Sequence, residues 1–198
     1  MSLIQIFARP PVPGRVKSRL AADIGNDKAA LVYIHCLKYN LDLVRKTSLP
    51  HEVWLSEATE DHIFSEFDCQ IQSGENLGDR MFHAIDNRLQ NSIFDNQIVL
   101  IGTDCLELCQ LNLTQAIDAL SNNDLVFVPA IDGGFALIGC SKIDPLLFSD
   151  VAWGGSEVLN KTLVNAKQLN FSYQLLDSVR DIDRLDDLNH YPDLIELI

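Results

Sequence analysis

Short apolar runs alternate with polar, periodic segments along the whole chain. Continuous apolar runs of about four to eight residues bounded by turn signals are typical of strands buried inside a sheet. The clearest runs cover 3–8, 97–101, 125–129 and 135–140, and shorter candidate strands cover 51–57, 69–72 and 171–176. The pattern therefore predicts a sheet of several short, buried strands.

Between these runs, apolar residues recur at intervals of three and four, which predicts amphipathic helices. The predicted helices cover 26–46, 77–91, 113–121 and 157–166, with a short helix near 61–67 and a final helix from about residue 186. Strands that alternate with helices predict an α/β fold with a mostly parallel sheet. In such sheets, ligands bind outside the carboxyl ends of the strands. The length of 198 residues fits one domain spanning 1–198.

Charge is distributed unevenly over this pattern. The chain has 15 Lys and Arg against 28 Asp and Glu, a formal net charge of −13, which argues against a general nucleic-acid binder. Residues 1–22 nevertheless carry four basic side chains and no acid, whereas residues 177–198 carry seven acids and two arginines. The acidic total therefore leaves room for one basic pocket near the N-terminus.

Nothing in the sequence indicates export or a membrane span. No apolar run approaches the roughly 18–20 residues that a membrane helix needs. The N-terminal stretch lacks the pattern of a signal peptide. The five cysteines form no CxxC pair, which favours reduced thiols. We expect a cytoplasmic protein.

The loop of residues 9–19 is the first candidate for chemistry. It combines three prolines, Gly14 and four cations directly after a predicted strand. A stiff backbone with cations at a strand end suits a diphosphate, whose charge needs donors held in place. The loop matches neither the Walker pattern nor GxGxxG. The alternative is a solvated basic loop.

Carboxylates near strand ends are the second candidate. Asp104 follows a buried strand and could bind a divalent metal as a hard oxygen ligand, although a turn or capping aspartate is the alternative. Gly133 and Gly134 would let the backbone approach a ligand closely, and Asp132 could bind a metal or a sugar hydroxyl, but Asp-Gly is also the commonest short signal of a hairpin turn. Asp181 and Asp183 alternate on an extended stretch and so face one side. Two like charges this close usually bind a cation or a hydrogen-bond donor, and the alternative is a solvated acidic turn.

Five blocks, taken in order, resemble a small bacterial family of GT-A-like glycosyltransferases within the nucleotide-diphospho-sugar transferase superfamily. The blocks are FARPPVPGRVKSRL at 7–20, LGDRM at 77–81, GTDC at 102–105, DGGF at 132–135, and DID at 181–183 followed by DDL at 186–188. This chain departs from the family pattern at four positions. It has Arg9 where the family favours Lys and Ser18 where the family favours Thr, and it has Leu106 in place of Pro and Phe135 in place of Tyr. None of these departures removes a carboxylate.

The resemblance implies a three-layer, Rossmann-like fold of the GT-A type. It implies a nucleotide held near the N-terminal loop and Mg²⁺ or Mn²⁺ on Asp104, with Asp183 as the second metal ligand and Asp132 as an alternative. Asp132 and Asp104 are then the expected catalytic residues. The expected nucleotide-binding residues are Arg9, Gly14, Lys17, Arg19, Gly78, Arg80 and Gly133.

Three functions fit these features. The first is metal-dependent transfer of a sugar from a nucleotide-diphosphate donor to an unknown small-molecule acceptor. The second is nucleotidyl transfer of the guanylyl or cytidylyl kind, which would release pyrophosphate instead of a nucleoside diphosphate. The third is a nucleotide-binding module without catalysis, against which the retained carboxylates argue. No nucleic-acid partner and no membrane span are expected.

Overall fold

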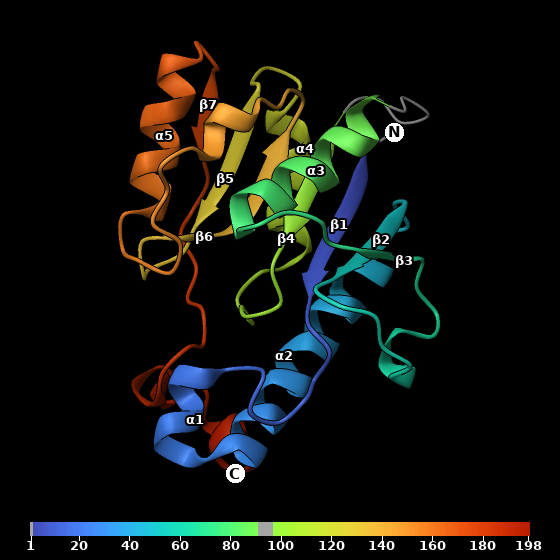
Figure 1. Cartoon of the computed structure of the whole chain (residues 1–198), viewed down its shortest axis with the longest axis vertical. Coiled ribbons are helices and arrows are strands. Elements are labelled where there is room, and N and C mark those ends of the chain that lie inside the picture. The colour runs from blue at the N-terminus through green and yellow to red at the C-terminus, as the bar shows by residue number, and fades with distance from the viewer. Residues whose placement is uncertain (1, 91–96) are drawn as a thin grey trace.

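A seven-stranded sheet forms the centre of the computed structural model, which describes residues 2–90 and 97–198 (Figure 1). The strands lie in the order β3-β2-β1-β4-β6-β5-β7. Their bounds are β1 Leu3–Ala8, β2 His51–Leu55, β3 Cys69–Ile71, β4 Ile98–Ile101, β5 Leu125–Pro129, β6 Phe135–Cys140 and β7 Tyr173–Leu175. Every strand predicted from the apolar runs is present, to within about two residues at each end.

The directions of the strands place the carboxyl ends of all the described strands except β6 at one edge of the sheet. Strands β3, β2, β1 and β4 are successively parallel, and β5 is parallel to β7. Strand β6 is antiparallel to both β4 and β5, so these two neighbours of β6 run in the same direction. The mostly parallel sheet is therefore confirmed, and the chain leaves β1, β4, β5 and β7 at one edge of it.

Helices cover both faces of the sheet. They are α1 Ser18–Ile24, α2 Asn26–Arg45, α3 Leu77–Gln90, α4 Gln110–Ala119, α5 Val158–Gln168 and α6 Pro192–Ile195, with the 3-10 helices η1 His62–Phe64, η2 Pro145–Phe148 and η3 Leu185–His190. Leu37 of α2 and Leu113 of α4 are buried in the core on one face. Ile85 of α3 and Ala166 of α5 are buried in the core on the other face. The three-layer α/β arrangement is confirmed. No helix within the described ranges is both long and apolar enough to cross a membrane.

Helix α1 was not predicted, because residues 18–24 look like part of the basic loop. Its N-cap residue, Lys17, has a left-handed backbone and makes no side-chain capping bond. The helix forms because its Leu20 is fully buried in a small core with residues of α2 and of the C-terminal segment. Tertiary packing thus decides this element, and short-range sequence signals do not reveal it.

Two further helices differ from the prediction. Helix α4 begins at Gln110, three residues early, because the Asn112 side chain accepts a hydrogen bond of 2.9 Å from the Cys109 amide. The helix expected from about Asp186 is instead η3 followed by the short α6. The predicted helix 77–91 is present to Gln90, and its last residue lies outside the described ranges.

The C-terminal segment, residues 179–198, returns from the sheet to α1. Figure 1 shows it in dark red, descending from the end of β7 toward α1. The Ile182 amide donates to the backbone oxygen of Asp104 over 2.9 Å. Ile182, Leu188 and Leu194 are buried in the small core formed with α1 and α2. This segment therefore closes one side of the edge where the strands end.

Candidate active site

A cleft of about 590 Å³ opens at the carboxyl edge of the sheet. Its lining comes from the loop after β1, the turns after β4 and β5, the start of α3 and the segment after β7. Seven of the ten residues singled out from the sequence line it: Arg9, Lys17, Arg19, Arg80, Asp104, Asp132 and Asp183. The topology thus brings together residues that are far apart in the sequence.

The other three residues singled out, Gly14, Gly78 and Gly133, do not line the cleft. A Cβ on Gly78 would lie 2.7 Å from Trp153, and one on Gly133 would lie 1.9 Å from the backbone oxygen of Ser156. Gly133 also has a φ of 94°, a conformation that favours glycine. Gly78 and Gly133 therefore permit close packing around the cleft, and their expected contact with a nucleotide stays a prediction.

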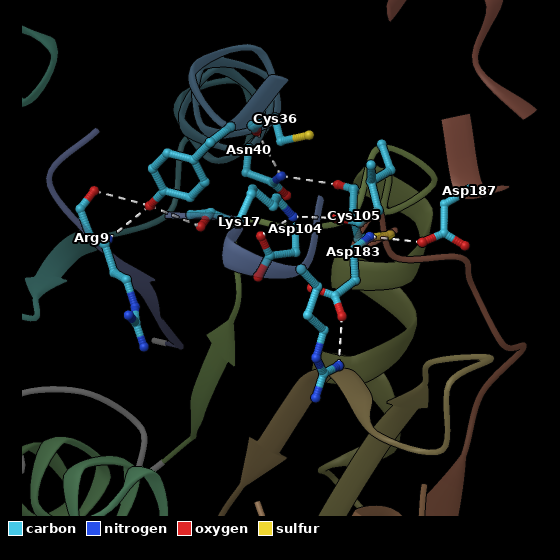
Figure 2. Close-up of polar contacts among 12 residues, drawn as sticks. Arg9, Lys17, Cys36, Asn40, Asp104, Cys105, Asp183 and Asp187 are labelled. Carbon is cyan, nitrogen blue, oxygen red and sulfur yellow. Dashed lines mark hydrogen bonds and ion pairs between the residues drawn. The ribbon is translucent and has the colours of Figure 1, made fainter. Parts of the chain in front are cut away.

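Lys17 is buried and joins three segments of the chain. Its ammonium donates to the backbone oxygen of Ile182 and forms an ion pair with Asp104 (Figure 2). The Lys17 side chain is 3% exposed, whereas that of Asp104 is 55% exposed. Burial alone would lower the pKa of Lys17, but the neighbouring Asp104 carboxylate outweighs it and raises that pKa. Lys17 therefore remains charged and fixes the turn after β4 against the C-terminal segment.

Arg19 makes a second link to the C-terminal segment. Its Nη1 lies 2.6 Å from Oδ2 of Asp183, and its Nη2 donates to the backbone oxygen of Gly154 over 2.9 Å. The Asp183 amide in turn donates to Oδ2 of Asp187 over 2.9 Å, at the beginning of η3. Arg19 and Lys17 are thus both paired with carboxylates of the cleft.

Arg9 is held through its backbone by Tyr33 of α2. The Tyr33 hydroxyl accepts from the Arg9 amide over 2.8 Å and donates to the Arg9 carbonyl over 3.0 Å. The Thr103 hydroxyl lies 3.4 Å from the hydroxyl oxygen of Tyr33. Within the described ranges, no carboxylate pairs with the Arg9 guanidinium. Sequence reasoning missed Tyr33, because its spacing on α2 marks it only as part of the apolar face.

Two further carboxylates of the cleft lie near each other. Oδ1 of Asp132 accepts from the Gly134 amide over 2.8 Å in the turn between β5 and β6, so the hairpin interpretation of this motif is confirmed. Asp181 also lines the cleft, on the same segment as Asp183, and no cation pairs with it in the part of the chain that the structure describes. Burial, followed by the charge of Asp132, raises the pKa of Asp181 to about 6.

The carboxylates fit a divalent cation in the chemistry of their donors. Asp104 and Asp183 each use one oxygen for an ion pair, and no hydrogen bond among the described residues engages the other oxygen. Residues 2–90 and 97–198 contain no group of three or more His, Cys, Asp or Glu side chains placed to hold a metal ion. Mg²⁺ commonly uses only one or two carboxylates, together with water and substrate phosphates. The donor set therefore suits a cation that binds together with a diphosphate.

Comparison with known proteins supports the fold and identifies the family. Residues 40–155 match the family model described as "Uncharacterized protein conserved in bacteria (DUF2064)". A Desulfovibrio desulfuricans G20 protein, provisionally assigned as a nucleotide-diphospho-sugar transferase, has a similar structure. The TM-score is 0.86 and the identity 28%, over 95% of this chain and 84% of that chain. No curated protein matches the chain.

Two more distant structures share the fold. The 4-diphosphocytidyl-2C-methyl-D-erythritol synthase of Anaerococcus prevotii DSM 20548 has a TM-score of 0.58 and 10% identity, over 98% of both chains. A cytidylyltransferase of Leptospira borgpetersenii serovar Hardjo-bovis has a TM-score of 0.56 and 18% identity, over 100% of this chain and 93% of that chain. Since the family model covers more than half of the sequence, the chain belongs to the DUF2064 family, with the fold of the GT-A-like superfamily of nucleotidyl and sugar transferases.

Proposed function

We propose that the protein is a transferase that moves a sugar from a nucleotide-diphosphate donor to a hydroxyl group of a small acceptor. The observation that supports this best is the cleft at the carboxyl edge of the sheet, which combines cations with carboxylates. Among the residues that the structure describes, five cationic side chains and four carboxylates line it. The similarity to the Desulfovibrio desulfuricans protein, at 28% identity over 95% of this chain, favours the same class of donor.

The cations of the cleft suggest where the diphosphate binds. Lys17 and Arg19 already pair with Asp104 and Asp183, so their charge is largely satisfied. Arg9 and Arg80 have no carboxylate partner among the described residues, although Nε of Arg80 donates to a backbone oxygen over 3.2 Å. Guanidinium groups bind phosphate oxygens strongly. In this proposal Arg9 and Arg80 hold the diphosphate, and the two paired cations orient the carboxylates beside it.

The carboxylates take the remaining roles. Asp104 would hold Mg²⁺ or Mn²⁺, with Asp183 or Asp132 as the second ligand, and the bound cation would neutralise charge on the departing diphosphate. Lys17 fixes Asp104 in position through their ion pair. Where Asp132 is not a ligand, its free oxygen accepts a hydrogen bond or a proton from the acceptor hydroxyl.

The test compares Asp104→Asn with Asp118→Asn, an exposed aspartate on α4. Wild type and both variants are incubated with a panel of nucleotide sugars and Mg²⁺ or Mn²⁺, and nucleoside diphosphate release is measured. Asp104→Asn is expected to lower turnover on the order of 10²–10³-fold, with a circular dichroism spectrum like that of the wild type. Asp118→Asn is expected to keep full turnover. Full turnover by Asp104→Asn would overturn the proposal.

Nucleotidyl transfer is the second candidate, because two cytidylyltransferase structures share this fold. The same cleft would then bind a nucleoside triphosphate, and a sugar phosphate or another phosphate would attack its α-phosphorus. Pyrophosphate would leave in place of a nucleoside diphosphate. The released product therefore separates the two candidates.

A further inference from the structure

The loop between η2 and α5 contributes an aromatic side chain to the cleft. Trp153, Gly154 and Gly155 all line it. The Trp153 ring packs against Phe148 with ring centroids 5.9 Å apart and planes inclined by 56°, and it lies close beside Gly78. Arg19 binds the Gly154 carbonyl over 2.9 Å. The half-buried indole is thus held in place before any ligand binds.

Other apolar side chains extend this surface. Leu77, in the first turn of α3, is 43% exposed, and Phe135 at the start of β6 is partly buried; both line the cleft. Ligand sites typically place apolar and aromatic side chains beside a few polar groups. When a ligand covers solvent-exposed apolar surface in a cleft, the removal of that surface from water favours binding. The wall formed by Trp153, Leu77 and Phe135, here named the apolar wall, therefore suits an uncharged part of a ligand.

The chemistry of the side chains distinguishes this part of the cleft from the part that suits the diphosphate. Phosphate oxygens need donors and cations, because they lose much hydration free energy on burial. The cleft supplies those groups from the loop after β1 and from Arg80 of α3. The three side chains of the apolar wall supply none, and Arg80 follows Leu77 by three residues on α3, so a neutral group on the wall would lie beside the diphosphate.

The turn that carries Asp132 lies directly against the segment that follows the Trp153 loop. The Gly133 carbonyl accepts from the Leu159 amide over 2.9 Å, and a Cβ on Gly133 would touch the backbone of Ser156. Asp132 is the carboxylate proposed above to bind the acceptor hydroxyl when Asp183 is the second metal ligand. The apolar wall and this carboxylate thus border the same end of the cleft.

We propose that Trp153 is the platform for the acceptor, and that the acceptor is an uncharged hydroxyl compound with an aromatic face. This inference rests on the proposed sugar transfer and deepens it, since it assigns the acceptor class. The aromatic face covers Trp153 and Leu77 while a hydroxyl group reaches Asp132. Stacking on the indole gives affinity, and the carboxylate gives orientation.

The experiment uses the emission of Trp153. The chain has two tryptophans, so a Trp54→Phe variant leaves Trp153 as the only indole. Phenyl β-D-glucopyranoside and 2-phenylethanol serve as aromatic hydroxyl probes, and methyl β-D-glucopyranoside and glycerol 3-phosphate serve as comparators without an aromatic ring. Saturable quenching by at least one aromatic probe, binding about 10-fold more tightly than the comparators, is the expected result. Quenching by neither aromatic probe overturns the inference.

A second measurement separates this inference from the proposed function. Thermal shifts with nucleoside diphosphates and Mg²⁺ are recorded for the wild type, Trp153→Phe and Trp153→Ala. Equal shifts in all three are expected, while Trp153→Ala weakens the aromatic probe about 10-fold and Trp153→Phe about 2-fold, by calorimetry. If both Trp153→Ala and Trp153→Phe lose the thermal shift with nucleoside diphosphates, Trp153 contacts the nucleotide base instead of the acceptor, and the inference is overturned. No shift in the wild type would overturn the proposed function itself.

Discussion

The substitution Asp181→Asn is expected to stabilise the protein at neutral pH. Burial and the charge of Asp132 raise the pKa of Asp181 from its ordinary value of 3.8 to about 6. A raised carboxyl pKa means that the folded state holds the proton more tightly than the unfolded state does. The stability cost is therefore absent below about pH 4, grows as the pH rises through 4 to 6, and is fully present at pH 7.

The magnitude follows from the size of this shift. The folded and unfolded pKa values of Asp181 differ by roughly 2, and each pKa unit corresponds to about 1.4 kcal/mol. The upper value of the stability cost is therefore about 3 kcal/mol. Since Asp181 borders an open cleft, solvent screening reduces this figure, and we expect a gain of about 1–3 kcal/mol at pH 7. An asparagine removes the charge at nearly constant volume, so the gain should vanish near pH 4.

Urea unfolding of the wild type and Asp181→Asn between pH 4 and 8, with a chelator present, measures this difference. The control is Asp177→Asn, which removes an exposed carboxylate upstream in the same part of the chain. The control should follow the wild type at every pH. A free energy of unfolding for Asp181→Asn no higher than that for Asp177→Asn at pH 7, or an equally large gain at pH 4, would contradict a destabilising charge on Asp181.

Three other substitutions test the architecture of the cleft. Gly133→Ala should lower the free energy of unfolding by about 2–4 kcal/mol, because its Cβ would lie 1.9 Å from the Ser156 backbone oxygen at a φ of 94°. Lys17→Met should lower it by about 1–3 kcal/mol and speed tryptic cleavage after Arg180, because the C-terminal segment loses its buried ammonium contact. Tyr33→Phe should weaken nucleoside diphosphate binding by about 3–10-fold in calorimetry, because the backbone at Arg9 loses two hydrogen bonds.

Each of these substitutions has a matched control. Gly102→Ala adds a Cβ that meets nothing within 4 Å, and Lys38→Met replaces an exposed lysine of α2. Tyr39→Phe removes a tyrosine hydrogen bond to Leu108 that lies outside the cleft. If the unfolding curves of Gly133→Ala and Lys17→Met coincide with those of their controls, the close packing at Gly133 and the buried contact of Lys17 do not stabilise the fold. Equal nucleotide affinity of Tyr33→Phe and Tyr39→Phe would contradict the role of Tyr33.

The fold was predictable because its strands are marked locally. The run at 98–101 is fully buried, and a continuous apolar run this short between turn signals is typical of a buried strand. Once the strands are parallel, Asp104 and Arg9 must meet at one edge. Helix α1 was missed, because Leu20 becomes buried only when the C-terminal segment packs on it.

The pairing of charges in the cleft could not be predicted from the sequence. Lys17 was expected on the diphosphate and Asp104 on the metal, yet the two side chains pair with each other across the fold. The sequence around Asp132 was compatible with both a turn and a ligand contact. In the structure Asp132 occupies a hairpin turn and also lines the cleft. Such partners depend on the crossing of the C-terminal segment, which no local pattern encodes.

The most direct test of the account is phosphorus NMR of the product released by the wild-type protein. The protein is incubated with Mg²⁺ and a nucleotide sugar chosen by thermal shift, with 2-phenylethanol and phenyl β-D-glucopyranoside offered as acceptors. If the protein transfers a sugar, the donor resonances are replaced by the two resonances of a nucleoside diphosphate, more slowly in Asp104→Asn. A parallel incubation replaces the nucleotide sugar with a nucleoside triphosphate and a sugar phosphate. Pyrophosphate formed there, with every nucleotide sugar left intact in the first incubation, would contradict sugar transfer.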